Sequence, residues 1–337
     1  MSNSPREPAR YVTLPSGFVY DRLAAVGHVM QPVHTRGIVS SRGPEEGTKS
    51  FAPRPHPPGV TLSFNTDGFV NALHAALADH TAGYVMQLRR HGQPIASAQR
   101  NWAKEPTDGS LAWGQDVRMH IASCSKLITA MSMTRTLAAH NLPASTKIIN
   151  YLPGYWVKGP NIDKITFAQL LTHTSGFRVD GSDMSYPTMK ALIERGVSAA
   201  EHGVPSYQNT NFSLCRILLP IMNRTIVASA TFPSFIEDQL WDHVTISAYA
   251  AYVEQHIFRP AGVTGPTLTH PEPDALAYAF APAAGWNSGD LSTESGGAGW
   301  HMSVNELLDV MSCFRRQGTI LSPTAAQTML DCGFGID

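Results

Sequence analysis

The stretch from Ser123 to about Ala139 constrains the fold more than any other part of this 337-residue chain. Small and apolar residues dominate it, and we expect its apolar positions to form one buried stripe of a helix, at Leu127, Ile128, Met131 and Leu137. Asn141-Leu142-Pro143 follows, and proline cannot continue a helix. The sequence therefore predicts a long helix that the rest of the domain must cover.

The start of the chain has a different composition. Residues 1–60 are rich in Pro, Gly and Arg and end in the proline-rich run Phe51–Gly59. Because proline removes backbone donors, this composition disfavours regular structure and predicts an N-terminal extension. Behind the polar pair Asn65-Thr66, apolar residues recur three and four positions apart, at Phe69, Leu73, Ala76 and Leu77. This pattern is typical of an amphipathic helix, and we expect the folded domain to occupy residues 61–337.

Two short runs that precede the long helix have the character of strands. Gly83–Gly92 and Pro94–Ala98 are joined through Arg90-His91-Gly92, which predicts a β-hairpin. Many short helical and loop segments follow the long helix. The sequence therefore predicts an α+β fold, in which an antiparallel sheet is flanked by helices and carries an inserted, mostly helical region.

The composition argues against several kinds of partner. The chain is 43% hydrophobic and 15% charged, which is enough for a large core, and its net charge of −1 offers no attraction to nucleic acid or an anionic membrane. Met1–Arg10 lacks the apolar run of a secretory signal, and no stretch approaches the roughly 18 apolar residues of a membrane span. We expect a soluble, cytoplasmic protein without a nucleic-acid or membrane partner.

The cysteines and histidines show no pattern typical of a disulfide framework or a metal site. Four cysteines lie far apart without a CxxC pair, and the 14 histidines include no HExxH motif. We interpret the cysteines Cys124, Cys215, Cys313 and Cys332 as reduced thiols. We expect no metal and no organic cofactor.

Ser123 and Lys126 form an S-x-x-K motif at the predicted helix start. Positions i and i+3 share a helix face, so the lysine amine can reach the serine hydroxyl. A lysine can remove the serine proton if burial or nearby cations lower its pKa. The backbone N–H of Ser123 would lie at the helix N-terminus, where it could bind an oxyanion. The alternative is a pair of ordinary surface side chains, although Lys126 stands within an apolar sequence.

Two further motifs follow along the chain. Leu170–Phe177 reads LLTHTSGF and comes after a short helix that we expect Thr166 to cap. Tyr207-Gln208-Asn209 combines a phenol that could accept or relay the Ser123 proton with an amide that could hold a substrate carbonyl or the lysine. The alternative for this segment is a polar turn before the apolar run Leu214–Ile221.

The order S-x-x-K, LLTHTSG, Y-x-N resembles the serine β-lactamase and penicillin-binding-protein superfamily, in particular its class C and family VIII esterase branch. The resemblance spans roughly residues 65–337. It includes segments similar to the family's first hairpin, post-helix segment, "PLGM" turn and "GGL.ST..DL" helix entry, at Tyr84–Arg100, Ile149–Pro153, Ile257–Val263 and Gly296–Asp309. It implies a β-lactamase-like fold.

The resemblance also implies roles for individual residues. Ser123 matches the acylated serine, Lys126 its partner, and Tyr207 and Asn209 the second catalytic motif. His173–Gly176 matches a structural segment near the site. Ser175 is not expected to be a nucleophile, because its neighbours do not form a G-x-S-x-G elbow.

The sequence departs from the family pattern in two places. After Gly299 no K-[ST]-G or H-x-G triplet occurs, so the strand that supplies the second oxyanion donor is not identified. We expect that the chain ends before these last strands; the alternatives are that another segment replaces the strand, for example one containing His34–Gly37, or that the protein is an inactive relative. The stretch Pro220–Ala248 has no family counterpart and could be a lid, an interface helix or a surface insertion.

These observations predict a serine hydrolase that cleaves a small ester or amide through a Ser123 acyl-enzyme. The same residues would serve a β-lactamase or a D-amino-acid-specific peptidase. A catalytically inactive relative that binds a ligand is the alternative of another class. The expected partner is a small-molecule substrate, and the oligomeric state stays open.

Overall fold

The computed structural model describes residues 11–13, 19–21, 64–78, 80–178, 183–273, 275–278, 284–314 and 318–336. The chain divides into two compact units, Met1–Asp79 and His80–Asp337. The expected extension at residues 1–60 lies mostly outside the described residues, and the domain boundary at 60/61 stays a prediction.

Within the first unit, two short strands and one helix are described. β1 (Tyr11–Thr13) pairs antiparallel with β2 (Val19–Asp21), although the composition of this region disfavours regular structure. α1 (Thr66–Leu77) begins after Asn65, whose side chain accepts a hydrogen bond from the Gly68 N–H. The predicted helix and its polar cap are confirmed.

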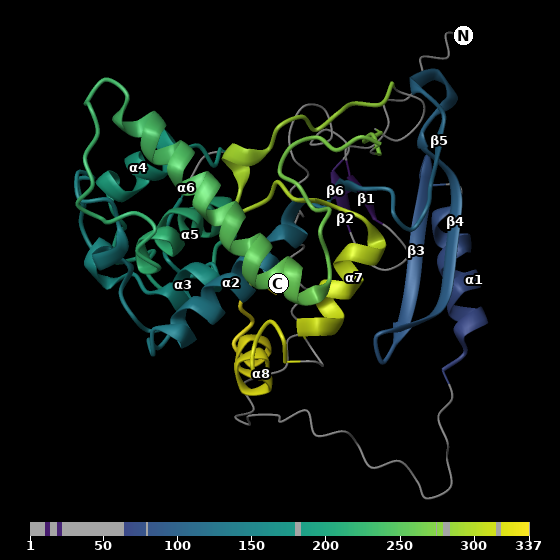
Figure 1. The fold of residues 1–337 in the computed structure, drawn as a ribbon, viewed down its shortest axis with the longest axis horizontal. Helices are drawn as coiled ribbons and strands as arrows, with labels where there is room; N and C mark the ends of the chain where they lie inside the picture. Colours follow the sequence, from purple (N-terminus) through teal and green to yellow (C-terminus); the bar gives the residue numbers. More distant parts are fainter. Residues whose placement is uncertain are drawn as a thin grey trace, which may run out of the picture. The chain divides into compact units, whose positions relative to one another are not determined.

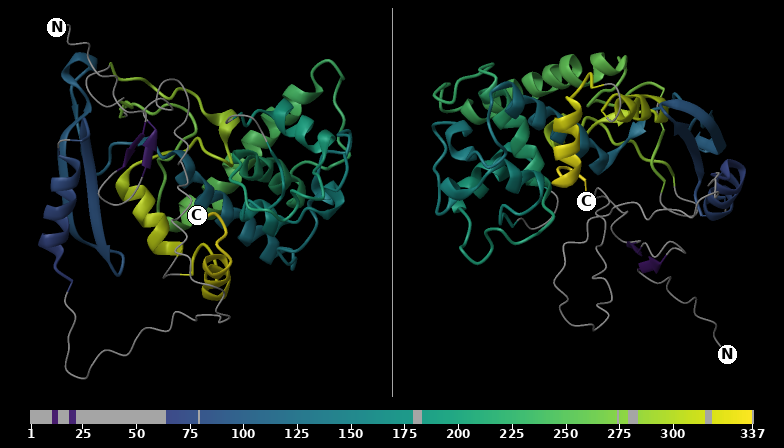
Figure 2. Two further views of the ribbon diagram at one scale, coloured as in Figure 1. Left: turned by 180° about the vertical axis from the view of Figure 1, so that it is seen from behind. Right: turned by 90° about the horizontal axis from the view of Figure 1, so that it is seen from below.

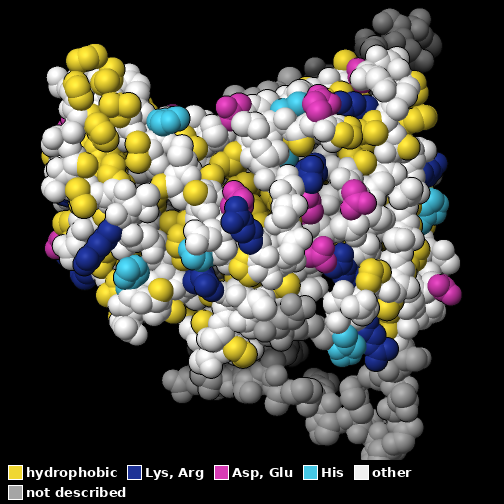
Figure 3. Space-filling model, viewed as in Figure 1, with side chains coloured by type: hydrophobic (Ala, Val, Ile, Leu, Met, Phe, Trp, Pro, Cys, Tyr) yellow, Lys and Arg dark blue, Asp and Glu magenta, His cyan; other side chains and the backbone are white. Residues whose placement is uncertain are grey.

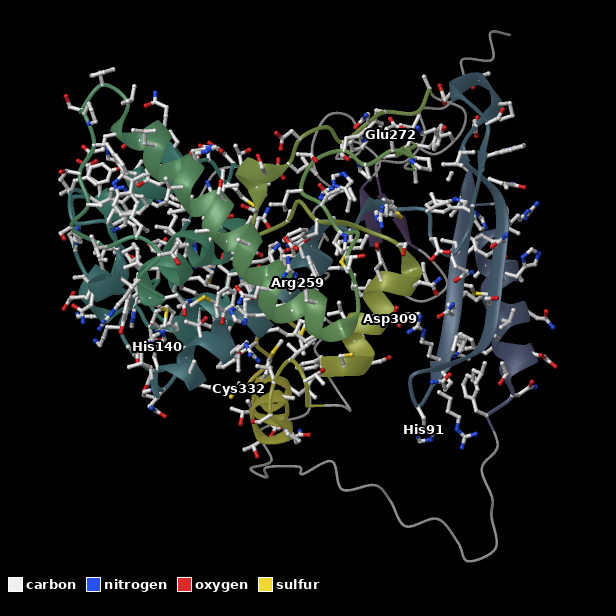
Figure 4. The ribbon with its side chains drawn as sticks, in the orientation of Figure 1. His91, His140, Arg259, Glu272, Asp309 and Cys332 are labelled. Atoms are coloured by element: carbon white, nitrogen blue, oxygen red, sulfur yellow. The ribbon has the colours of Figure 1, made fainter. Side chains whose placement is uncertain are left out.

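The second unit contains the predicted hairpin. β3 (Gly83–Arg90) and β4 (Gln93–Lys104) are antiparallel, and β5 (Leu111–Ala112) pairs with the far end of β4. His91 and Gly92 form the turn with φ of 56° and 80°. β4 continues to Lys104, past the predicted end at Ala98. α7 (Val304–Ser312) contacts β3, and its Asp309, labelled in Figure 4, pairs with Arg89.

The long predicted helix is the centre of the helical region. A 3₁₀ turn (Ala122–Cys124) leads into α2 (Ser125–Ala139). Three helices contact α2: α5 (Asn209–Met222), α6 (Glu237–Val253) and α8 (Pro323–Asp331). The buried residues of α2 therefore extend well beyond one stripe and include the polar Ser125, Lys126, Thr129, Ser132 and Thr136. Of the four predicted stripe residues, only Leu127 is not fully buried.

The remaining helices complete the helical region, which Figures 1 and 2 show on the side of this unit opposite β3 and β4. α3 (Phe167–Leu171) begins after Thr166, which caps it as the sequence predicts. The structure adds Gln169, which completes a capping box. α4 (Tyr186–Arg195) follows. The other short elements are 3₁₀ turns at Pro106–Asp108, Ile148–Tyr151, Ile162–Lys164, Arg259–Ala261 and Ser292–Glu294, a π turn at Glu254–Phe258, and the strands β6 (Met119–His120) and β7 (His301–Met302). The α+β architecture is confirmed.

The stretch at 220–248 is not a loosely attached insertion. Its C-terminal part belongs to α6, which packs on α2 and α5 and buries Trp241, Thr245 and Tyr249 completely. The interpretation as a surface insertion is therefore wrong for α6. The loop before α6 exposes Val227 and Phe235, and Figure 3 shows hydrophobic side chains gathered over that end of the molecule.

No helix in the described ranges is both long enough and apolar enough to span a membrane.

An ion pair inside the helical region makes a stability prediction. The Arg216 side chain on α5 is completely buried and pairs with Asp242 on α6. Removing the carboxylate leaves a buried cation without its counterion, so we expect Asp242→Ala to lower the free energy of unfolding by about 3 kcal/mol. Chemical denaturation measures this.

The matched control is Glu254→Ala, which breaks the exposed pair with Arg259. It should change the free energy of unfolding by about 1 kcal/mol or less. Equal losses in the two variants would contradict the argument from burial.

Candidate active site

Ser123 lies where two parts of the chain meet. It belongs to the 3₁₀ turn that leads into α2, just after strand β6. β6 pairs with β7, and the Ile121 N–H donates to the Trp300 carbonyl at 2.9 Å. Ala122 has a φ of 47°, an uncommon conformation for a residue with a Cβ. Pairing between distant segments therefore positions the turn that carries Ser123.

Lys126 is almost completely buried, with 2% of its surface exposed. Its Nζ donates to three oxygen atoms: Ser123 Oγ at 3.1 Å, Asn209 Oδ1 at 2.8 Å and the Gly297 carbonyl at 2.7 Å. The same nitrogen lies 4.9 Å from the centre of the Tyr207 ring. A buried amine needs such partners, because an unpaired one would be costly to desolvate. The surface interpretation of the Ser123–Lys126 pair is therefore wrong.

Tyr207 reaches Ser123 from the residues before α5. Its hydroxyl lies 2.7 Å from Ser123 Oγ. Two residues later, Asn209 begins α5 and accepts from Lys126. The structure therefore brings Ser123, Lys126, Tyr207 and Asn209, the four site residues predicted from the sequence, into one hydrogen-bonded group.

The LLTHTSG motif holds the Tyr207 segment in place. His173 Nδ1 accepts from the Gln208 N–H at 3.1 Å, and its ring centre lies 4.5 Å from that of Tyr207. The His173 carbonyl accepts from the Ser206 N–H at 2.8 Å. His173 adopts a φ of 53°, so the turn presents both its ring and its carbonyl to the same segment. This geometry agrees with the structural role that the family resemblance implies.

Ser175, in the same motif, is buried and donates to Asn211 Oδ1 at 2.6 Å. It has no access to a substrate, in agreement with the prediction that it is not a nucleophile.

Two consecutive glycines complete the surroundings of Lys126, and the sequence interpretation assigned them no role in the site. Gly296 has a φ of 88°, and a Cβ on it would lie 2.5 Å from the Phe212 carbonyl oxygen. A Cβ on Gly297 would lie 2.9 Å from Ser213 Oγ and 3.0 Å from the Asn209 carbonyl oxygen, both on α5. Only glycines let this segment approach α5 closely enough for the Gly297 carbonyl to reach Lys126. The adjacent glycines were the sequence feature from which a close approach of two segments at this point could have been predicted.

Glu294 is a further residue near the site that sequence reasoning missed. Burial raises the pKa of its carboxyl, the charge of Asp183 raises it further, and Lys126 opposes both effects. Its Oε2 is buried and has no hydrogen-bond partner in the described part of the chain. Glu294 lies in the same segment as Gly297, and its carboxyl interacts electrostatically with Lys126.

His120 precedes the nucleophile turn and contacts the glycine segment. Its Nε2 accepts from the Gly299 N–H at 3.3 Å. Burial, together with the neighbouring His301, lowers the pKa of His120 to about 4. His120 is therefore neutral at neutral pH, which its role as an acceptor requires.

Among the described residues, no group of three or more His, Cys, Asp or Glu side chains is arranged to hold a metal ion.

The comparisons with known proteins agree with this geometry. The β-lactamase family model matches residues 69–331. This chain belongs to the β-lactamase family. A putative penicillin-binding protein of Bacillus subtilis, PbpX, is 26% identical over 149 residues, which are 43% of this chain and 31% of that protein.

Solved structures share the fold. The octameric penicillin-binding protein homologue from Pyrococcus abyssi has a TM-score of 0.56 at 15% identity, over 78% of this chain and 58% of that one. A D-stereospecific amidohydrolase from Streptomyces sp. has a TM-score of 0.55 at 22% identity, over 77% and 75%. At these identities the likeness concerns the fold alone. The predicted β-lactamase and penicillin-binding-protein resemblance is confirmed.

The lowered pKa of His120 makes a pH prediction. An unfolded histidine takes up a proton near pH 6.5, whereas folded His120 does so only near pH 4. The stability that neutral His120 contributes is therefore complete above about pH 6.5 and is lost as the pH falls toward 4. The loss should reach about 3 kcal/mol at most.

The measurement is the free energy of unfolding at several pH values, for the parent protein and His120→Gln. Glutamine keeps an acceptor for the Gly299 N–H but does not titrate. The variant should lose less stability between pH 6.5 and 4. An unchanged pH dependence would contradict the assignment to His120.

Proposed function

We propose that this protein is a serine hydrolase that cleaves small esters or amides through an acyl-enzyme on Ser123. One observation carries the proposal: Tyr207 Oη and Lys126 Nζ both lie within hydrogen-bond distance of Ser123 Oγ, at 2.7 and 3.1 Å. A serine hydroxyl is a weak nucleophile until a positioned group accepts its proton.

Tyr207 and Lys126 share the work of moving that proton. The contacts with Asn209 and Gly297 use two of the N–H groups of Lys126 and direct the third position of the nitrogen at Ser123. As an ammonium, Lys126 donates to Ser123 Oγ and favours negative charge on Tyr207. Tyr207, the closer of the two groups, then accepts the serine proton. As a neutral amine, Lys126 would present its lone pair to the same hydroxyl.

The reaction proceeds in two halves. Ser123 Oγ attacks the substrate carbonyl carbon, and its proton passes to the Tyr207–Lys126 pair. The carbonyl oxygen becomes an oxyanion, for which the backbone N–H of Ser123 is the assigned donor. The bond to the leaving alcohol or amine breaks, and that group takes the proton. Water then attacks the Ser123 ester, which releases the acid and restores the serine hydroxyl.

An amide substrate has support from one comparison. The structure of a D-stereospecific amidohydrolase has the same fold over most of both chains. A panel of p-nitrophenyl esters, D- and L-amino acid amides and nitrocefin separates an esterase, an amidase and a β-lactamase. Absence of turnover with every member of the panel would favour the inactive, ligand-binding relative.

Covalent labelling tests the nucleophile. A fluorophosphonate should label the parent protein at one site and should not label Ser123→Ala, because only an activated serine attacks the phosphorus. The control is Ser132→Ala, since Ser132 is a buried serine on α2 that donates to the Ile128 carbonyl of its own helix. Equal labelling of parent and Ser123→Ala would overturn the assignment.

Steady-state kinetics test the proton transfer. Tyr207→Phe removes the hydroxyl nearest Ser123 Oγ and should lower kcat about 10²- to 10⁴-fold. Tyr151→Phe is the matched control, because Tyr151 packs against Phe167 and lies outside the proposed mechanism. A kcat for Tyr207→Phe within twofold of the control would exclude Tyr207 from the chemistry.

A further inference from the structure

A chain of three hydrogen bonds connects α6 to the glycine segment beside Lys126. The Trp300 Nε1–H lies 3.4 Å from Tyr249 Oη, Tyr249 Oη lies 2.7 Å from Thr129 Oγ1, and Thr129 Oγ1 lies 2.7 Å from the Gly296 carbonyl. Thr129 and Tyr249 are fully buried and Trp300 is nearly so. Trp300, Tyr249 and Thr129 take no part in the proposed proton transfer.

The donor and the acceptor in each of these hydrogen bonds follow from the chemistry of the groups. An indole N–H only donates and a carbonyl only accepts. Thr129 has one hydroxyl hydrogen, which it directs to the Gly296 carbonyl in preference to the Ser125 carbonyl at 3.3 Å. Tyr249 must therefore donate to Thr129. Burial raises the pKa of Tyr249 to about 12, so its hydroxyl keeps this proton at neutral pH.

The last of these hydrogen bonds, from Thr129 to the Gly296 carbonyl, lies next to the contact that holds Lys126. Thr129 and Lys126 are three residues apart on one face of α2. They bind consecutive carbonyls, because Thr129 donates to that of Gly296 and Lys126 to that of Gly297. The Gly296 carbonyl belongs to the peptide unit that joins the two glycines, whereas the Gly297 carbonyl belongs to the next peptide unit. The hydrogen bond from Thr129 therefore holds the peptide plane that directly precedes the Gly297 carbonyl.

We infer that Thr129 and Tyr249 are positioning residues for Lys126. They hold the Gly296–Gly297 carbonyls so that the Lys126 amine faces Ser123. This inference rests on the proposed function for its effect on rate. It connects α6, which lies mostly in the stretch that the sequence left open as a lid, an interface helix or a surface insertion, to the catalytic group.

The same two helices provide a matched control. Thr136, farther along α2, donates to the Tyr252 hydroxyl on α6 at 2.8 Å. This bond also joins a threonine to a tyrosine between α2 and α6. It has no contact with Gly296 or Gly297 in the described residues, so its loss should affect stability without affecting Lys126.

The test compares Thr129→Val and Tyr249→Phe with Thr136→Val and Tyr252→Phe. Valine keeps the shape of threonine but removes the donor to the Gly296 carbonyl. In the first pair we expect kcat to fall about 10- to 100-fold with little change in KM, and fluorophosphonate labelling to slow equally. The control pair should stay within twofold of the parent protein. Thr129→Ser, which restores the hydroxyl, should recover most of the rate.

A readout independent of rate keeps the inference separate from the proposed function. Crystal structures of the parent protein and Thr129→Val should show that the 2.7 Å contact between Lys126 Nζ and the Gly297 carbonyl is lost in the variant. An intact contact, or equal kcat losses in both pairs, would overturn the inference. If the parent protein is not labelled at all, the proposed hydrolase function fails, whereas the crystallographic comparison still decides the positioning role.

Discussion

The burial of Lys126 is the constraint on which the rest of the site depends. An amine in the protein interior is tolerated only when hydrogen-bond acceptors replace the water it has lost. Here the acceptors come from three separate segments: the turn that carries Ser123, the start of α5 at Asn209, and the glycine loop at Gly297. Satisfying one side chain therefore brings together the nucleophile, the second motif and a loop more than 80 residues beyond that motif in sequence.

The helix that carries Lys126 differs from an ordinary surface helix because it buries several other polar side chains as well. α2 is covered by α5, α6 and α8, so its polar residues need partners within the protein. Ser132 satisfies its hydroxyl within the helix, whereas Thr129 and Thr136 bond to tyrosines of α6. These bonds join α6 to α2. The core therefore includes α6, although most of this helix lies in Pro220–Ala248, for which the sequence resemblance offers no counterpart.

A second set of contacts holds Tyr207, the other side chain that hydrogen-bonds to Ser123. Tyr207 lies outside regular structure and could adopt many orientations by itself. The ring and backbone of His173 restrict it, and a positive φ at His173 makes both contacts possible. The LLTHTSG motif thus forms a turn that supports the Tyr207 segment. Tyr207 and Asn209 contact Ser123 and Lys126, whereas LLTHTSG holds the Tyr207 segment in place.

The sequence by itself determined the local features of this protein: the hairpin turn, the helix caps at Asn65 and Thr166, the long helix from about Ser123, and the i, i+3 spacing of Ser123 and Lys126. These depend on neighbours a few residues apart, which a single sequence displays. The motif order was also enough to predict the family and to select Tyr207 and Asn209. Only the tertiary structure decided the placement of the Gly297 carbonyl, the hydrogen bonds from Tyr249 through Thr129, the neutral state of His120 and the electrostatic interaction of Glu294 with Lys126. The physical reason is that hydrogen-bond partners more than 100 residues apart, and the loss of solvent around them, arise from packing and leave no periodic pattern in the sequence.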